Sequence, residues 1–241
     1  QLIVDEGDPF NKILHTKSIN KLKSKNLFSK VEYEILDTEN ADQKDINISI
    51  EEKPTGELMA GAGHGTDGST FSIGIKENNF RGEGVQLNSK LSLSEETVKG
   101  FLEYTHPNFA FSERQLSTSL ESTVTDRLTD YGYKSSLNSV SLGTRYEQFE
   151  NTFFSPKLSI SSETLDTTST ASAAYKKQDG SYFDATLGYG LTLDKRNSAF
   201  QPSSGYYSSW YQSLPVVSEN SEIINGYIIT GYKELIDDMI V

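Results

Sequence analysis

Cysteine is absent from this chain of 241 residues, and basic residues are few, 22 against 34 acidic ones. The lack of cysteine excludes a disulfide scaffold and a thiolate metal site. The net charge of -12 argues against binding of DNA or RNA, which relies on neutralising phosphates. Histidine is also scarce, and His15, His64 and His106 lie far apart without the spacing of metal ligands. We therefore expect no metal, no other cofactor and no nucleic-acid partner.

Long apolar runs are missing as well, and the mean hydropathy is -0.50. No run approaches the roughly 18 residues of a helix that spans a membrane. This does not exclude a membrane protein, because a spanning strand needs only about 9 to 11 residues with every second one apolar. No signal peptide is visible, and the opening QLIVDEGDPF resembles the end of a helix and a loop. We therefore expect a piece of a longer protein.

Residues 1–52 predict a small α+β unit. Residues 11–25 mix apolar side chains with lysines, the pattern of an amphipathic helix that Asn11 caps and Asn26 ends. Two short alternating runs, 31–35 and 46–50, flank the turn-rich DTENADQKD and predict a hairpin. The apolar residues assigned to the helix are Ile13, Leu14, Ile19 and Leu22.

Residues 53–56 are predicted to be a hinge, because proline stiffens one side of the segment and glycine frees the other. Beyond it, apolar and polar residues alternate almost throughout 57–241, which predicts about ten strands of roughly 9 to 12 residues. One helix-like interruption lies near 171–177. The hinge residues are Lys53, Pro54, Thr55 and Gly56, and strands are expected around 57–65, 71–75, 85–88, 98–104, 116–121, 140–143, 154–163, 183–193, 205–213 and 222–234.

Composition favours a transmembrane antiparallel β-barrel over a water-soluble sandwich. A sandwich has inward faces thick with Val, Ile, Leu and Phe. Several apolar faces here are thin, and the polar faces are rich in Ser, Thr, Gly, Gln and Asn, as a wet lumen would be. Aromatic residues form girdles at both rims of outer-membrane barrels. The predicted fold is therefore mainly β, with a secreted β-sandwich adhesin as the alternative. Tyrosines expected at strand ends are Tyr104, Tyr131, Tyr133, Tyr206, Tyr207, Tyr227 and Tyr232.

No catalytic constellation is found, so we do not expect an enzyme. Glu121, Asp126 and Asp130 do not match the spacing of an EF-hand and are better explained as part of an exposed loop of mixed charge. Asp184 and the run Asp194–Arg196 have neither a nucleophile nor a histidine partner. A turn with capping charges explains them better.

The stretch GELMAGAGHG, residues 56–65, alternates like a strand but is poor in side chains. Glycine weakens a strand, because it loses the most backbone entropy and offers no side chain to pack. From the residues alone, a bend or a close backbone approach explains it best. One face carries Gly61, Gly63 and Gly65, and the other carries Leu58, Ala60, Ala62 and His64.

The order of features resembles one family. DEGDPFN, the helix ending KLKSKNLFSKVEYEI, and DINISIEEKPTGELMAGAGHGTDGSTFSIGIKENNFRGEG are similar to the last POTRA domain and first barrel strands of the BamA family of outer-membrane protein assembly factors. THPNF at 105–109 resembles the family's turn after the fourth strand. LDKRNSAFQPSSGYY is similar to its D-x-R-…-P-x-x-G-Y hairpin, through Asp194, Arg196, Pro202, Gly205 and Tyr206.

The resemblance implies three parts. Residues 1–52 would be most of the last POTRA domain in the periplasm, 53–56 the hinge, and 57–241 about the first ten of sixteen strands of a barrel in the bacterial outer membrane. The family's R-G-F/Y loop and final strand would lie beyond Val241. Arg81 and Gly82 are not that motif, because they follow the second strand and precede Glu83.

The resemblance also implies a function for the glycine strand. In this family the first strand forms a weak seam with the last one, and the seam opens so that an incoming strand can pair with the first strand's edge. The partners would be unfolded outer-membrane proteins, outer-membrane lipid, and a BamD-type lipoprotein that meets Glu6, with other assembly subunits. Open alternatives are a passive porin and a secretion pore of the TamA or two-partner type.

Overall fold

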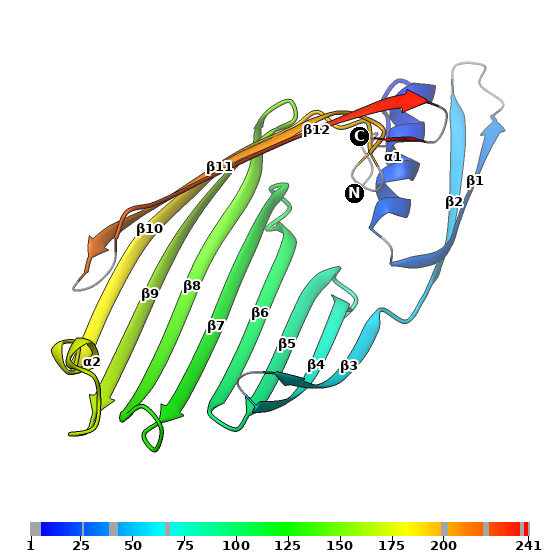
Figure 1. Ribbon diagram of the computed structural model, residues 1–241. Coiled ribbons are helices and arrows are strands. Elements are labelled where there is room, and N and C mark those ends of the chain that lie inside the picture. Colours follow the sequence, from blue (N-terminus) through cyan, green and yellow to red (C-terminus); the bar gives the residue numbers. More distant parts are fainter. Residues whose placement is uncertain are drawn as a thin grey trace.

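The computed structural model describes residues 6–25, 27–38, 43–65, 68–198, 202–218, 222–236 and 239–240. It shows a helix–hairpin unit at one end of a large, strongly curved sheet (Figure 1). Asn26, predicted to end the first helix, lies outside the described residues.

The helix–hairpin unit consists of α1 (Lys12–Ser24) and the antiparallel strands β1 (Phe28–Asp37) and β2 (Lys44–Glu52). The Asn11 side chain accepts hydrogen bonds from the backbone N–H of Ile13 at 2.9 Å and of Leu14 at 3.2 Å, which confirms the predicted cap. Capping of this kind satisfies N–H groups that have no partner within the helix.

The buried face of α1 differs from the predicted one. His15, Ser18 and Ile19 are buried, and the His15 ring meets the ring of Tyr33 on β1 edge to face at 4.7 Å between centroids. Of the apolar residues that the sequence assigned to the helix, Ile19 is buried but Ile13 is 69% exposed. The hairpin is only two strands wide and covers a narrow stripe of the helix, which the apolar pattern alone could not locate.

The main sheet is antiparallel, and neighbours in sequence are neighbours in space from β3 to β13. All predicted strands are confirmed, as is the helix-like interruption, α2 (Ala173–Lys177). The strands are β3 (Gly56–Gly65), β4 (Gly68–Phe80), β5 (Val85–Ser94), β6 (Thr97–Phe109), β7 (Arg114–Arg127), β8 (Tyr133–Phe149), β9 (Thr152–Thr167), β10 (Gly180–Asp194), β11 (Ser204–Val217), β12 (Ile224–Ile236) and the short β13 (Met239–Ile240).

Several strands are longer than the predicted 9 to 12 residues, and β8 has 17. Cross-strand pairing continues past the alternating residues. For example, Asp126 pairs with Lys134, and Arg127 pairs with Tyr133. These end segments do not continue the alternation of apolar and polar residues, so the period gave no signal there. Tyr104 and Tyr227 also lie several residues inside β6 and β12, although the sequence predicted them at strand ends.

The two faces of the sheet differ in chemistry. One cross-strand row is apolar in five of its six members and remains 39% to 54% exposed in them, although it crosses the middle of the sheet. A curved sheet spreads side chains on its convex face and crowds them on its concave one, so this apolar row lies on the convex face. The residues of this row, in strand order from β4 to β9, are Ile75, Ser89, Leu102, Leu120, Val140 and Ile160.

Hydroxyl groups dominate the concave face. The hydroxyls of Ser119 and Ser141 lie 2.6 Å apart on neighbouring strands, and those of Thr192 and Ser209 lie 3.1 Å apart. Asp184 is also on this face and is 9% exposed. An apolar outer face with a polar, hydroxyl-rich inner one is the arrangement of a membrane barrel wall.

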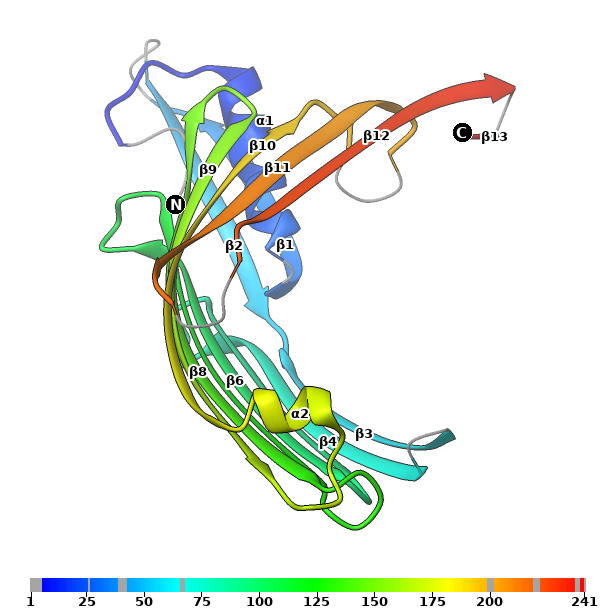
Figure 2. The same ribbon diagram turned by 60° about the vertical axis from the view of Figure 1, so that its left-hand side comes forward.

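A single continuous sheet contradicts the sandwich alternative, which requires two packed sheets. The curvature is clear in Figure 2, where α2 lies at the end of the sheet opposite to α1. Neither of the two helices in the described part of the chain has the length and hydropathy to cross a membrane.

Candidate functional site

The glycine-rich strand β3 is the outermost strand of the sheet. It pairs with β4 over its full length, from Gly56 with Glu77 to Gly65 with Gly68, and has no other strand partner among the described residues. All ten of its residues are exposed. The backbone N–H and C=O groups that point away from β4 therefore form an open edge, which can template another strand.

The register confirms the predicted faces of β3. Gly61 lies opposite Ser72 and Gly63 opposite Thr70, on the concave side, while Ala60 lies opposite Ile73 on the convex side. Side chains on the convex side of β3 make few contacts, because alanine offers only a methyl group and Leu58 is 74% exposed. His64 lies near the far end of the strand, and its Nδ1 is 3.1 Å from the hydroxyl oxygen of Ser69.

The space around these glycines would accept a larger side chain. A Cβ added at Gly63 or Gly65 would meet no atom within 4 Å, and one at Gly61 would meet only the Ser72 hydroxyl at 3.2 Å. None of the three has a left-handed backbone conformation. The explanation by a bend or a close backbone approach therefore fails at Gly63 and Gly65. What glycine does there is remove side-chain contact from the edge and weaken the strand.

The linker before β3 is tied to β4. The Thr55 hydroxyl donates to the Glu77 carboxylate, and the Asn78 amide donates to the Thr55 carbonyl at 3.4 Å. Lys53 N–H donates to the Leu27 carbonyl at 3.2 Å. Gly56, which the sequence placed in the hinge, is the first residue of β3 because its backbone pairs with Glu77. The connection consists of Lys53, Pro54 and Thr55, and these contacts were not predicted because they depend on the register of β4.

The turn between β10 and β11 holds the second motif that the sequence singled out. Arg196 donates from Nε and Nη2 to the two oxygens of Asp194, at 2.8 Å and 2.7 Å, and its guanidinium lies over the ring of Tyr207. The hydrogen bond to Asp194 raises the pKa of Arg196 further above its ordinary value, so the pair stays charged. Gly205 has φ +96, and a Cβ there would lie 2.1 Å from the Lys195 carbonyl oxygen. This motif is structural.

THPNF occupies the end of β6 rather than a turn. The chain reverses after it, where Ala110, Phe111 and Glu113 adopt positive φ. The register of β6 and β7 shifts between His106 and Phe109, which lets the strand run on into the segment that the sequence predicted as a turn.

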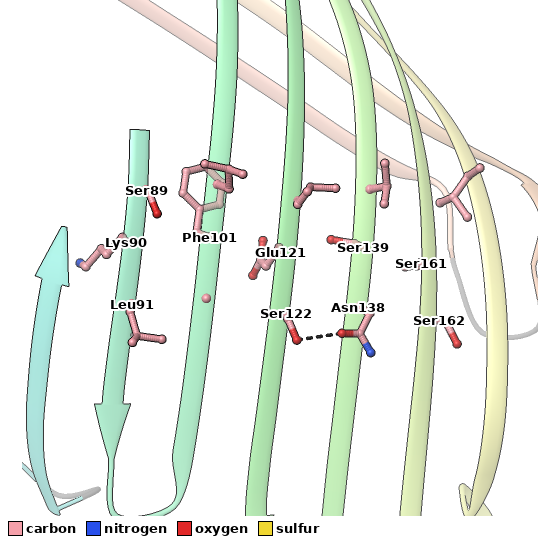
Figure 3. Close-up of a pocket in the computed structure, with 15 residues that line it drawn as sticks. Ser89, Lys90, Leu91, Phe101, Glu121, Ser122, Asn138, Ser139, Ser161 and Ser162 are labelled. Carbon is pink, nitrogen blue, oxygen red and sulfur yellow. Dashed lines mark hydrogen bonds between the residues drawn. The ribbon is translucent and has the colours of Figure 1, made fainter. Parts of the chain in front are cut away.

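The remaining candidate residues are not brought to this edge. Glu6 lies in an exposed turn before α1, in the helix–hairpin unit. Among the described residues no three His, Asp or Glu side chains gather as metal ligands. A depression of about 630 Å³ crosses the middle of the sheet, where the Ser122 hydroxyl donates to the Asn138 carbonyl oxygen at 2.8 Å (Figure 3).

Comparison with known proteins gives the following matches. The Omp85 superfamily domain matches residues 79–238. The outer membrane protein assembly factor BamA of Neisseria meningitidis serogroup B is 27% identical over 132 residues, an alignment that covers 48% of this chain and 17% of that protein.

Two solved structures share the fold. BamA from Haemophilus ducreyi lacking POTRA domains 1–3 superposes with a TM-score of 0.72 at 22% identity, over 98% of this chain and 48% of that one. CdiB from Acinetobacter baumannii superposes with a TM-score of 0.59 at 13% identity, over 95% of this chain and 44% of that one. The chain thus spans about half the length of these structures.

Proposed function

Because the chain belongs to the Omp85 superfamily, we propose that its sheet is part of a β-barrel in the bacterial outer membrane that inserts other outer-membrane proteins, with β3 as the strand that receives them. The similarity to an outer membrane protein assembly factor supports this proposal. The helix–hairpin unit, residues 1–52, would then be most of the last POTRA domain in the periplasm.

The observation that carries the proposal is the glycine content of β3. Its glycines at Gly63 and Gly65 are needed neither for space nor for backbone conformation. A strand that must hold a barrel closed would gain from side chains at these positions. A strand that must separate from one neighbour and accept another gains from their absence, because its backbone groups stay available for strand addition.

The driving force comes from the client. In hydrocarbon each unsatisfied backbone group costs several kcal/mol, so a client strand that enters while hydrogen-bonded to β3 avoids much of that cost. The folding of the client then supplies the free energy, and the mechanism uses no nucleotide, metal or other cofactor. The protein acts as a non-enzymatic assembly factor.

The proposed partners follow from this role. Unfolded outer-membrane proteins pair with β3, and lipid contacts the apolar convex face. A BamD-type lipoprotein is proposed to meet Glu6, which is exposed in the turn before α1. Other assembly subunits complete the complex. Glu6→Lys in the full-length protein should weaken capture of that lipoprotein, and undiminished capture would remove Glu6 from the proposal.

Insertion kinetics test the proposal. Gly63→Val adds a stiff side chain whose Cβ would meet no atom within 4 Å, so we expect it to strengthen β3. Gly61→Val is less clean because of the Ser72 hydroxyl. We expect the full-length protein with Gly63→Val, reconstituted in liposomes, to insert a client barrel several-fold more slowly. Gly100→Val is the matched control, since its Cβ would meet only the Ser122 carbonyl oxygen at 4.0 Å, inside the sheet.

Equal insertion rates for Gly63→Val, the control and the unchanged protein would contradict the role of β3. The same liposomes distinguish an assembly factor from a passive pore, because a passive pore would conduct ions and insert no client. Conductance without insertion would replace the assembly function by that of a porin or a secretion pore.

A further inference from the structure

The central part of β3 repeats itself every two residues. Residues 60–63 read AGAG, with alanine on the convex face and glycine on the concave face. Successive side chains of a strand point to opposite faces, so a neighbouring strand that shifts by one residue exchanges its faces, whereas a shift by two residues keeps them. After a shift by two, the neighbour meets alanine again on one face and glycine again on the other. This part of β3 therefore cannot distinguish the two registers.

Two of the larger side chains of β3 are directed at β4. The Nδ1 of His64 is 3.1 Å from the Ser69 hydroxyl oxygen. The Cε of Met59 lies 3.2 Å from the point that a Cβ on Gly74 would occupy, so Met59 extends across β4. Both side chains therefore lean toward β4 and away from a strand that pairs with the opposite edge of β3.

Leu58 is a large apolar side chain of β3 that β4 leaves uncovered. It lies opposite Ile75 on the convex face, and 74% of it remains exposed. Ala60 follows on the same face with only a methyl group. Glu57 is exposed on the concave face, but an ion pair on a wet face contributes little to the choice of register. Leu58 is thus the position at which the contact with a neighbouring strand changes most when the register changes.

We propose that Leu58 fixes the register in which a client strand pairs with β3, by packing against one large apolar side chain on the lipid-facing side of the client. Leu58 lies at the end of β3 that leaves the helix–hairpin unit (Figure 1). Cross-strand contacts between apolar side chains shift the ratio of two registers by up to about fivefold. The inference rests on the proposed function and adds a positioning residue to it: the glycines make β3 easy to enter, and Leu58 stops the client from sliding.

Disulfide mapping measures the register directly. In the full-length protein, with any other cysteine replaced by serine, Ala62→Cys reports on the position of a stalled client. Ala62 lies on the same face as Leu58 and is not the residue under test. A series of clients carries one cysteine each, at lipid-facing positions two residues apart in the terminal strand. We expect one client position to give about fivefold more disulfide than the positions two residues away.

Variants of Leu58 test its role. Leu58→Ala removes the contact, so disulfides should form at two or three client positions in amounts within about twofold of one another. Leu58→Met keeps a large apolar side chain and should restore the single preferred position. Glu57→Ala is the matched control, because it changes the adjacent exposed side chain on the other face and should leave the preference unchanged. A merely structural role would lower the total yield of disulfide without redistributing it.

The outcomes separate this inference from the proposed function. Disulfides spread evenly over client positions in the unchanged protein, or a preference that survives Leu58→Ala, would overturn the role of Leu58 and leave β3 as the acceptor strand. A preference lost in Glu57→Ala and kept in Leu58→Ala would assign the register to the charge instead. Absence of a disulfide at every client position would contradict the proposed function itself, and the role of Leu58 would fall with it.

Discussion

Two interior glycines of this sheet, Gly74 and Gly188, differ from the glycines of its edge strand β3. In the interior, a Cβ at Gly74 would lie 3.1 Å from the Ser89 carbonyl oxygen, and one at Gly188 would lie 2.8 Å from the Tyr211 hydroxyl, so glycine is needed for close packing. At the edge, Gly63 and Gly65 face open space. The comparison shows that the weakness of β3 is not imposed by packing. It is a property of the sequence of that strand.

The largest effect is expected where glycine is needed most. Gly205→Ala places a Cβ 2.1 Å from the Lys195 carbonyl oxygen, at a residue with φ +96. We expect a loss of about 1 to 3 kcal/mol from backbone strain, with more if the turn cannot shift. Heating until the compact electrophoretic band of the folded protein disappears measures this. Gly231→Ala on the neighbouring strand β12 has open space and should leave the transition unchanged.

The next effect distinguishes interior from edge directly. Gly74→Val must displace the backbone at Ser89, and overpacking of this kind costs about 1 to 3 kcal/mol. Gly63→Val should instead leave stability unchanged or raise it by up to about 1 kcal/mol, because a strand glycine is entropically unfavourable. Unfolding in urea ranks the two variants. If Gly63→Val destabilised the protein as much as Gly74→Val, the distinction between the two regions would collapse.

The smallest effect concerns the tether at the start of β3. Thr55→Val removes the hydroxyl that donates to Glu77, which should cost about 0.5 to 1.5 kcal/mol. Hydrogen exchange should become faster in the linker and in the first residues of β3. Thr164→Val removes a hydroxyl contact to Ser181 far from the linker and serves as the control. Equal exchange in both variants would show that the tether does not restrain β3.

Much of the fold could be predicted from the sequence, because alternation with period 2 reports directly on a sheet with one apolar and one polar face. The cap at Asn11 was predictable for a similar reason, since it depends on residues within one turn. Both the ends of β8 and the buried face of α1 were missed. The ends of β8 continue to pair with the neighbouring strands beyond the alternating run, and the buried face of α1 depends on how much of the helix a two-stranded hairpin covers.

The candidate site, too, could be predicted only in part. The faces of β3 followed from alternation, but the open space beside Gly63 and the bond between Thr55 and Glu77 depend on the register with β4.

The most direct measurement is a crosslink between β3 and a client during insertion. These 241 residues contain no cysteine, so a thiol introduced here is specific once any cysteine elsewhere in the full-length protein has been replaced by serine. Ala62→Cys on β3 and Leu93→Cys on β5 lie in one cross-strand row, on the same face, with Phe71 between them. In the full-length protein with a stalled client that carries one cysteine in its terminal strand, a disulfide should form at Ala62→Cys and not at Leu93→Cys. Equal crosslinking at both positions, or none at β3, would contradict strand addition at this edge.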